Sequence, residues 1–65
     1  MNSELIPVDS SVIRAVGYAD GTLYVEFHSG RTYTHPRVPY SLFEGLLNAT
    51  SHGIFYNRHI RGKFK

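Results

Sequence analysis

Apolar and polar residues alternate on both sides of Asp20-Gly21, the clearest local pattern in the chain. Asp-Gly between two alternating segments is typical of a two-residue hairpin turn, because both central residues need positive φ. A turn closed by Ala19 and Thr22 sets Val16 opposite Val25. One face of the hairpin then gathers the larger apolar side chains, namely Val16, Tyr18, Leu23, Val25 and Phe27. The pattern therefore predicts an antiparallel hairpin with one buried face.

A third strand follows, and the turn before it allows two registers. Residues 28–30 can form a three-residue loop that ends in a left-handed glycine, which sets Tyr33 against Val25 and places Tyr33 and His35 on the core side. Alternatively, residues 29–30 alone form a two-residue turn, which moves both rings to the opposite face as an exposed stripe. Turn chemistry favours the three-residue loop. In that register we expect most of Tyr33 in the core, with its hydroxyl at the rim.

Beyond Pro36 the spacing of apolar residues becomes helical. Pro39 suits the first position of a helix, and the apolar residues after it form one stripe at intervals of three and four, namely Leu42, Phe43, Leu46 and Leu47. Gly45 inside this helix costs about 1 kcal/mol relative to Ala, which indicates a close approach to the sheet. Ser51 can cap a second short helix, which we expect Gly62 to end.

These elements predict a single domain of the α+β class. It is a small antiparallel β-meander of three to four strands, packed by one or two C-terminal helices. Residues 1–7 are either an edge strand, because Pro7 is unsuited to a central one, or disordered. Residues 62–65 form a basic tail. The 65-residue chain has no cysteine, so its modest core depends on aromatic side chains or on self-association.

Charge is distributed unevenly along the chain. The net charge is +2, and all five acidic residues precede position 45. Three arginines against those five acids give −2 for residues 1–44, and four cations give +4 for residues 45–65. This basic segment alternates cations with aromatic and histidine side chains, which suits a polyanion with bases that can be stacked upon. By charge alone, a solvated basic tail explains the segment equally well.

Other kinds of chemistry lack the residues they need. The four histidines include no pair at the spacing of helical metal ligands, and no cysteine assists them, so we expect no metal site. The serines fall in predicted turns and caps, so we expect no catalytic residues. The glycines match no phosphate-binding loop, and we expect no cofactor. No apolar segment reaches the ~20 residues of a membrane span and no signal peptide precedes the domain, so we expect a cytoplasmic protein without membrane contact.

The ordered set of glycines, prolines and aromatic residues resembles the KTSC domain over roughly residues 8–64. The residues that carry the resemblance are Ser10-Ser11, Ile13, Val16-Gly17-Tyr18, Phe27, Gly30, Tyr33, Val38-Pro39, Phe43, Leu46, Ala49, Ser51, Gly53 and Phe55 to Asn57. The family's central Tyr-x-Tyr pattern here reads Tyr33-Thr34-His35. His35 therefore either stacks on a base less well than tyrosine or puts a polar tip at the core edge.

The resemblance implies one KTSC-like domain over residues 1–65. The family looks like a set of stand-alone small bacterial proteins, and the domain also occurs at the C-terminus of some lysyl-tRNA synthetases. RNA binding is suggested for the family as a whole. The resemblance implies no catalytic residues.

We therefore expect a small non-enzymatic binding module that binds RNA through a C-terminal basic and aromatic face. Arg58 and Arg61 are one helical turn apart, so we expect them to project from one side of the second helix. The expected phosphate ligands are Arg37, Arg58, Arg61, Lys63 and Lys65. The expected stacking groups are Tyr56, His59, Phe64 and His35.

Their neighbours are expected inside the domain, with Phe55 and Ile60 buried and Asn57 binding backbone groups in the core. The alternative function is a protein–protein interaction module or a homodimer, which would use apolar contacts or a free strand edge.

Overall fold

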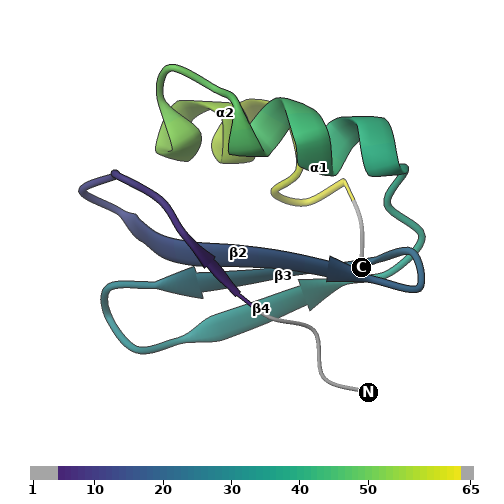
Figure 1. Cartoon of the computed structure of the whole chain (residues 1–65), viewed down its shortest axis with the longest axis horizontal. Helices are drawn as coiled ribbons and strands as arrows, with labels where there is room; N and C mark the ends of the chain where they lie inside the picture. The colour runs from purple at the N-terminus through teal and green to yellow at the C-terminus, as the bar shows by residue number, and fades with distance from the viewer. Residues whose placement is uncertain (1–4, 64–65) are drawn as a thin grey trace.

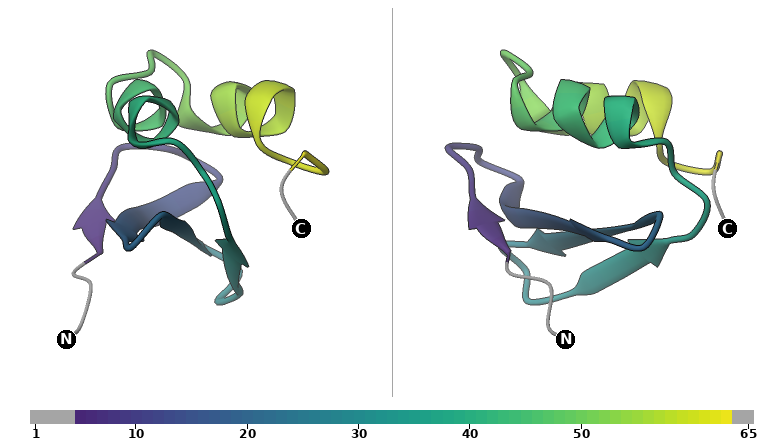
Figure 2. Two further views of the ribbon diagram at one scale, coloured as in Figure 1. Left: turned by 90° about the vertical axis from the view of Figure 1, so that its right-hand side faces the viewer. Right: turned by 45° about the vertical axis from the view of Figure 1, so that its right-hand side comes forward.

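The computed structural model describes residues 5–63, which form one antiparallel sheet with both helices packed on the same face (Figure 1). The strands lie in chain order across the sheet as β1 (Ile6–Pro7), β2 (Ile13–Ala19), β3 (Thr22–Phe27) and β4 (Thr32–His35). Helices α1 (Tyr40–Leu47) and α2 (His52–His59) lie side by side above the sheet (Figure 2). The expected α+β fold is confirmed, with four strands and two helices in this part of the chain.

The β2–β3 hairpin has the predicted register. Asp20 and Gly21 take positive φ values of 53° and 78°, as a two-residue turn of this kind requires. Tyr18 pairs with Leu23, and Val16 pairs with Val25. The alternation of side chains therefore places the predicted apolar face against the helices.

A β-bulge at the start of β2 changes which side chains enter the core. The register shifts between Ile13 and Ala15, so Arg14 is the extra residue. Strict alternation from Val16 would place Arg14 on the core face. With the bulge, Ile13 is fully buried and Arg14 is exposed.

The β3–β4 turn is the three-residue loop. The Phe27 N–H donates to the Arg31 carbonyl over 2.8 Å, and Gly30 has a φ of 100°. Tyr33 pairs with Val25, which confirms the favoured register. The expectation that most of Tyr33 lies in the core is wrong, because the ring is 45% exposed. β4 is an edge strand, and the Tyr33 ring packs against Phe27 on one side and borders an open cavity on another.

Helix α1 has the predicted apolar stripe but a different start and a different close contact. Pro39 is extended, with ψ at 145°, so it precedes the helix as its N-cap residue. The expected approach of Gly45 to the sheet is wrong. A Cβ at Gly45 would lie 2.9 Å from Cζ of Phe55, so this glycine allows α1 to approach α2.

Helix α2 begins where the sequence predicts and ends earlier. The Ser51 hydroxyl accepts a hydrogen bond of 3.4 Å from the Ile54 N–H, which confirms the N-cap. The helix ends at His59 with Ile60 as C-cap residue. Gly62, with a φ of 76°, lies in the turn that follows.

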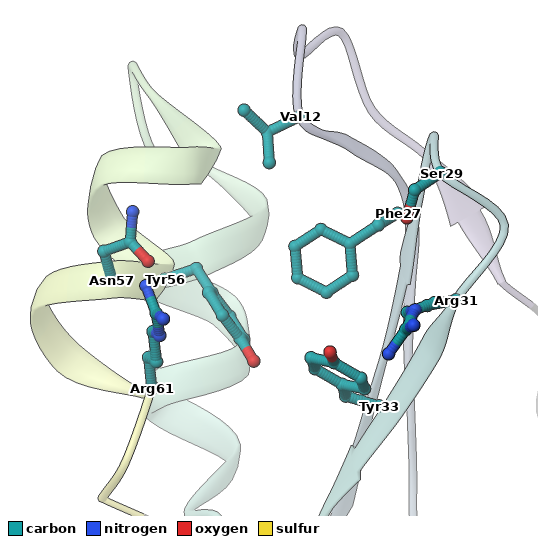
Figure 3. A pocket seen from close by; sticks show the side chains of 8 residues that line it. All are labelled: Val12, Phe27, Ser29, Arg31, Tyr33, Tyr56, Asn57 and Arg61. Atoms are coloured by element: carbon teal, nitrogen blue, oxygen red, sulfur yellow. The ribbon is translucent and has the colours of Figure 1, made fainter.

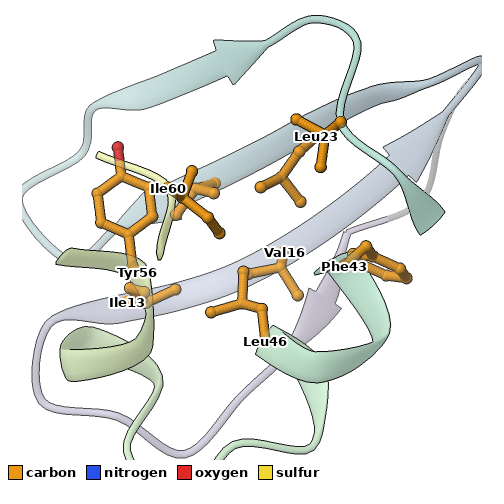
Figure 4. Close-up of a cluster of buried hydrophobic side chains, with 9 residues drawn as sticks. Ile13, Val16, Leu23, Phe43, Leu46, Tyr56 and Ile60 are labelled. Atoms are coloured by element: carbon orange, nitrogen blue, oxygen red, sulfur yellow. The ribbon is translucent and has the colours of Figure 1, made fainter. Parts of the chain in front are cut away.

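The core fills the space between the sheet and the helices (Figure 4). Its buried members are Ile13, Val16, Leu23, Val25, Val38, Phe43, Leu46, Tyr56 and Ile60. Burial of Ile60 is confirmed. Tyr56, only 4% exposed, takes the buried place that was expected for Phe55, which packs partly buried against the cluster. No helix within residues 5–63 has the length and apolar character needed to cross a membrane.

Candidate nucleic-acid interface

A cavity of about 310 Å³ opens between α2 and the β3–β4 hairpin, and we call it the arginine cleft (Figure 3). Among residues 5–63, two of the residues that line it are arginines and none carries a carboxylate. The lining residues are Val12, Phe27, Ser29, Arg31, Tyr33, Tyr56, Asn57 and Arg61. The cleft therefore concentrates positive charge beside aromatic rings.

The hairpin wall carries Arg31 and Tyr33. The short loop before Arg31 is closed by the hydrogen bond between the Phe27 N–H and the Arg31 carbonyl. Arg31 directly precedes β4 and Tyr33 lies within it, and both side chains project toward α2 (Figure 3). The Phe27 and Tyr33 ring centroids are 5.4 Å apart, which supports the exposed tyrosine ring from one side.

The helix wall carries Asn57 and Arg61. The N–H groups of Ile60 and Arg61 both donate to the Tyr56 carbonyl over 2.9 Å, so the chain turns sharply after the helix. This turn places Arg61 on the wall opposite Arg31 (Figure 3). The expectation that Asn57 binds backbone groups in the core is wrong, because its side chain is exposed and lines the cleft.

Tyr56 lies at the floor of the cleft. Its ring meets the Phe27 ring edge to face, with centroids 5.3 Å apart. Burial raises the pKa of the Tyr56 phenol above its ordinary 10.0, and the neighbouring Tyr33 phenol acts in the same direction, while Arg61 acts in the opposite one. Tyr56 is therefore neutral at physiological pH.

The structure corrects the expectation that His35 and Tyr56 stack on bases. His35 is 8% exposed, and its Nε2 lies 3.0 Å from the Tyr56 hydroxyl in a buried hydrogen bond. Both rings are enclosed because β4 and α2 meet at this point. They join the two walls of the cleft and leave no ring face open to a base.

A second depression of about 330 Å³ lies over α1 and α2, and we call it the helix groove. Arg58 and His59 line it, together with Gly45, Ala49, Thr50, Ser51, Ile54 and Phe55. The His59 and Phe55 ring centroids are 4.5 Å apart, so one face of His59 is engaged within the helix.

The expectation that Arg58 and Arg61 project from one helical side is wrong. Arg58 lines the helix groove and Arg61 lines the arginine cleft. The reason is that α2 ends at His59, so Arg61 belongs to the turn and does not follow the helical spacing.

The other expected phosphate ligands lie around these two depressions. Arg37 is exposed in the loop between β4 and α1, with a positive φ of 58°. Lys63 is exposed in the turn after α2, where its N–H donates to the Ile60 carbonyl. Phe64 and Lys65 lie outside the described residues. Within residues 5–63, no group of three histidine or acidic side chains is placed to hold a metal ion.

Arg31 is a site residue that was not predicted from the sequence. A usable signal was present, because the three-residue loop register puts Arg31 on the same strand face as Tyr33. Arg31 was overlooked because it lies far from the basic C-terminal segment.

Comparison with known proteins identifies relatives over nearly the whole chain. The sequence profile of the KTSC domain matches residues 9–64. A crystal structure of a KTSC domain protein from Yersinia pestis has a TM-score of 0.94 and 33% sequence identity, and the match covers 98% of this chain and 93% of that one. The two chains are therefore of similar length and share one fold.

Two sequence relatives differ greatly in length. A protein from Tsukamurella paurometabola is 41% identical over 61 residues, which cover 91% of both chains. A lysine–tRNA ligase from Nostoc punctiforme is 43% identical over 63 residues, which cover 94% of this chain and 11% of the ligase. The chain therefore spans about a tenth of the length of that ligase.

Proposed function

The chain belongs to the KTSC domain family, and we propose that it is a non-enzymatic module that binds RNA through the arginine cleft. One observation carries the proposal. Arg31 and Arg61 stand on opposite walls of one cavity, and the part of its lining that the structure describes includes no carboxylate.

Two guanidinium groups around one space suit a phosphate group. Each guanidinium presents planar N–H donors, and its hydrogen bonds to phosphate are charge-assisted. An anion between the two walls could bind both arginines. Neither arginine would first have to release an acidic partner from the described lining of the cleft. Such contacts position a nucleic acid backbone but do not read its sequence.

The relatives favour RNA among the polyanions. The name of the Nostoc punctiforme relative describes a ligase that acts on tRNA. A domain of this kind is therefore found within an enzyme that handles RNA, which supports RNA as the partner. We accordingly place the protein in the cytoplasm, where its RNA partner would be found.

The expected ligand set changes with the geometry. Arg31 joins Arg61 as a direct phosphate ligand. Arg37, Arg58 and Lys63 are exposed outside the cleft, where they add to the positive field that attracts the strand. Lys65 and Phe64 remain proposed contacts of the basic end, and His59 remains a proposed contact in the helix groove.

Affinity measurements with charge-matched variants test the proposal. Labelled single-stranded RNA would be titrated by fluorescence anisotropy with the original protein, with Arg31→Ala/Arg61→Ala and with Arg37→Ala/Arg58→Ala. Both double variants lose two positive charges. We expect the cleft variant to bind about 30-fold more weakly, and the outer variant to lose about threefold, because only the cleft arginines make direct charge-assisted contacts.

Salt dependence separates phosphate binding from an apolar protein interface. Between about 50 and about 200 mM salt, affinity for RNA should fall steeply in the original protein and less steeply in the cleft variant. Equal losses in the two double variants would contradict a defined site. Absence of RNA binding at the lower salt concentration would overturn the function and favour the alternative of a protein-binding module.

A further inference from the structure

We infer that the arginine cleft accommodates one unpaired nucleotide of an RNA strand, with its phosphate between Arg31 and Arg61 and its base on the Tyr33 ring. This inference rests on the RNA-binding function proposed above. It adds a preference for single-stranded over double-helical RNA.

The arginine cleft has the volume of a small binding site. A cavity of about 310 Å³ is at the lower end of the range for small-molecule sites, which suits one nucleotide. In an A-form helix the bases are stacked on one another, and their faces are closed to side chains. A duplex could therefore offer only its backbone to this surface, whereas an unpaired nucleotide could enter the cleft.

The Tyr33 ring is partly exposed and is packed against Phe27. The ring is 45% exposed, although it lies on the face of the sheet that the helices cover. The ring centroids of Phe27 and Tyr33 are 5.4 Å apart, and those of Phe27 and Tyr56 are 5.3 Å apart. A ring that is held in place on one side and open on another is a preorganised surface for stacking a base.

Polar side chains line the cleft beside the Tyr33 ring. Asn57 and Ser29 are exposed and face the same cavity from opposite walls (Figure 3). An amide offers both donors and an acceptor, and a hydroxyl offers one donor and acceptor lone pairs. These groups could bind the edge of a base or the ribose 2′-hydroxyl while the arginines hold the phosphate.

The helix groove lacks this combination. Among the described residues that line it there is one arginine, Arg58, and the exposed large apolar side chain is the aliphatic Ile54, which is 60% exposed. The aromatic ring of Phe55 is partly buried and already engaged by His59. The groove can therefore add charge to a bound strand, but only the cleft pairs two cations with an exposed aromatic ring.

The test compares a single-stranded RNA with a blunt-ended RNA duplex of equal phosphate number at the same salt concentration. We expect the original protein to bind the single strand about tenfold more tightly, because a stacked base adds to the shared phosphate contacts. Tyr33→Ala should remove that preference, so that the single strand binds no more tightly than the duplex. Tyr33→Phe should retain the preference. Tyr40→Ala is the control, because Tyr40 is 57% exposed and does not line the cleft.

A second measurement does not depend on any variant. In the original protein, ring protons of Tyr33 should shift upfield when the single strand binds, as stacking on a base requires, and should not do so with the duplex. Equal affinity for both RNAs without an upfield shift would overturn the nucleotide site while leaving RNA binding intact. Absence of binding to either RNA would overturn the function on which the inference rests.

Discussion

The arginine cleft and the helix groove differ in how the chain brings their charges together. Arg58 and Arg61 are three positions apart, yet they line different depressions. Arg31 and Arg61 are far apart in sequence, yet they face one another across one cavity (Figure 3). The end of α2 at His59 and the closed loop before Arg31 decide this arrangement. Charges that cluster in a sequence therefore need not form one surface.

The two depressions also differ in what lies beneath them. The cleft rests on Tyr56, which belongs to the core and hydrogen-bonds to His35. The groove rests on the contact between Gly45 and Phe55, with Ile54 projecting to solvent. The wall of the cleft thus includes a core residue, whereas the shape of the groove is set by the distance between α1 and α2.

The largest difference should appear when one side chain from each depression is truncated. Tyr56→Ala removes a buried aromatic ring, and we expect a loss of about 3 kcal/mol in the free energy of unfolding. Ile54→Ala removes a side chain that is 60% exposed, and we expect a change below about 0.5 kcal/mol. Urea unfolding followed by circular dichroism measures both. Similar losses for the two variants would contradict the assignment of Tyr56 to the core.

A smaller effect is expected when the groove is filled. Gly45→Ala gains about 1 kcal/mol of helix propensity, but its Cβ would lie 2.9 Å from Phe55 Cζ. Since overpacking typically costs about 1–3 kcal/mol, we expect a net loss of about 1 kcal/mol in unfolding experiments. RNA affinity should stay unchanged, because the cleft is not touched. A loss of RNA affinity in the folded variant would place the binding site in the groove.

Alkaline pH should lower the stability of the folded protein through Tyr56, which lines the arginine cleft, by a smaller amount. Burial raises the pKa of Tyr56 in the folded protein above its ordinary 10.0, so the unfolded chain loses this proton first as pH rises. The stability from the neutral phenol is fully present below pH 10 and is lost as pH rises through the folded-state pKa. Urea midpoints measured from neutral to alkaline pH should therefore fall less in Tyr56→Phe than in the original protein. An identical fall in Tyr56→Phe would contradict this role.

The smallest effect is expected at Arg37, which belongs to neither depression. Its positive φ of 58° costs a non-glycine residue about 1 kcal/mol. The next residue is held firmly, because the Val38 N–H donates to the Gly21 carbonyl and the Tyr18 hydroxyl donates to the Val38 carbonyl. Arg37→Gly should therefore keep the loop conformation and raise stability by less than about 1 kcal/mol in thermal unfolding, because glycine also gives the unfolded chain more freedom. Lower stability would show that the arginine side chain supports the loop.

The sheet could be predicted from the sequence because its signals are local. Asp20-Gly21 specified one register, and the glycine at the end of the 28–30 loop favoured the correct register of the next turn. The bulge at Arg14 had no comparable signal, since it depends on how Ile13 packs in the finished core.

The candidate site was harder to predict because it depends on where elements end. A short helix can stop one turn earlier than its glycine suggests, and that difference moved Arg61 away from Arg58. Burial of His35 and Tyr56 depends on the meeting of β4 and α2, which no local pattern encodes. Arg31 becomes a site residue only through its opposition to Arg61 across the cleft.

Side-chain NMR of the arginines tests the central claim most directly. Nε–Hε resonances of the original protein, assigned with single Arg→Lys variants, would be followed during titration with single-stranded RNA. We predict that the resonances of Arg31 and Arg61 shift together and saturate at the same RNA concentration, while that of Arg58 shifts little. Shifts centred on Arg58, or equal small shifts at every arginine, would show that the cleft is not the RNA site.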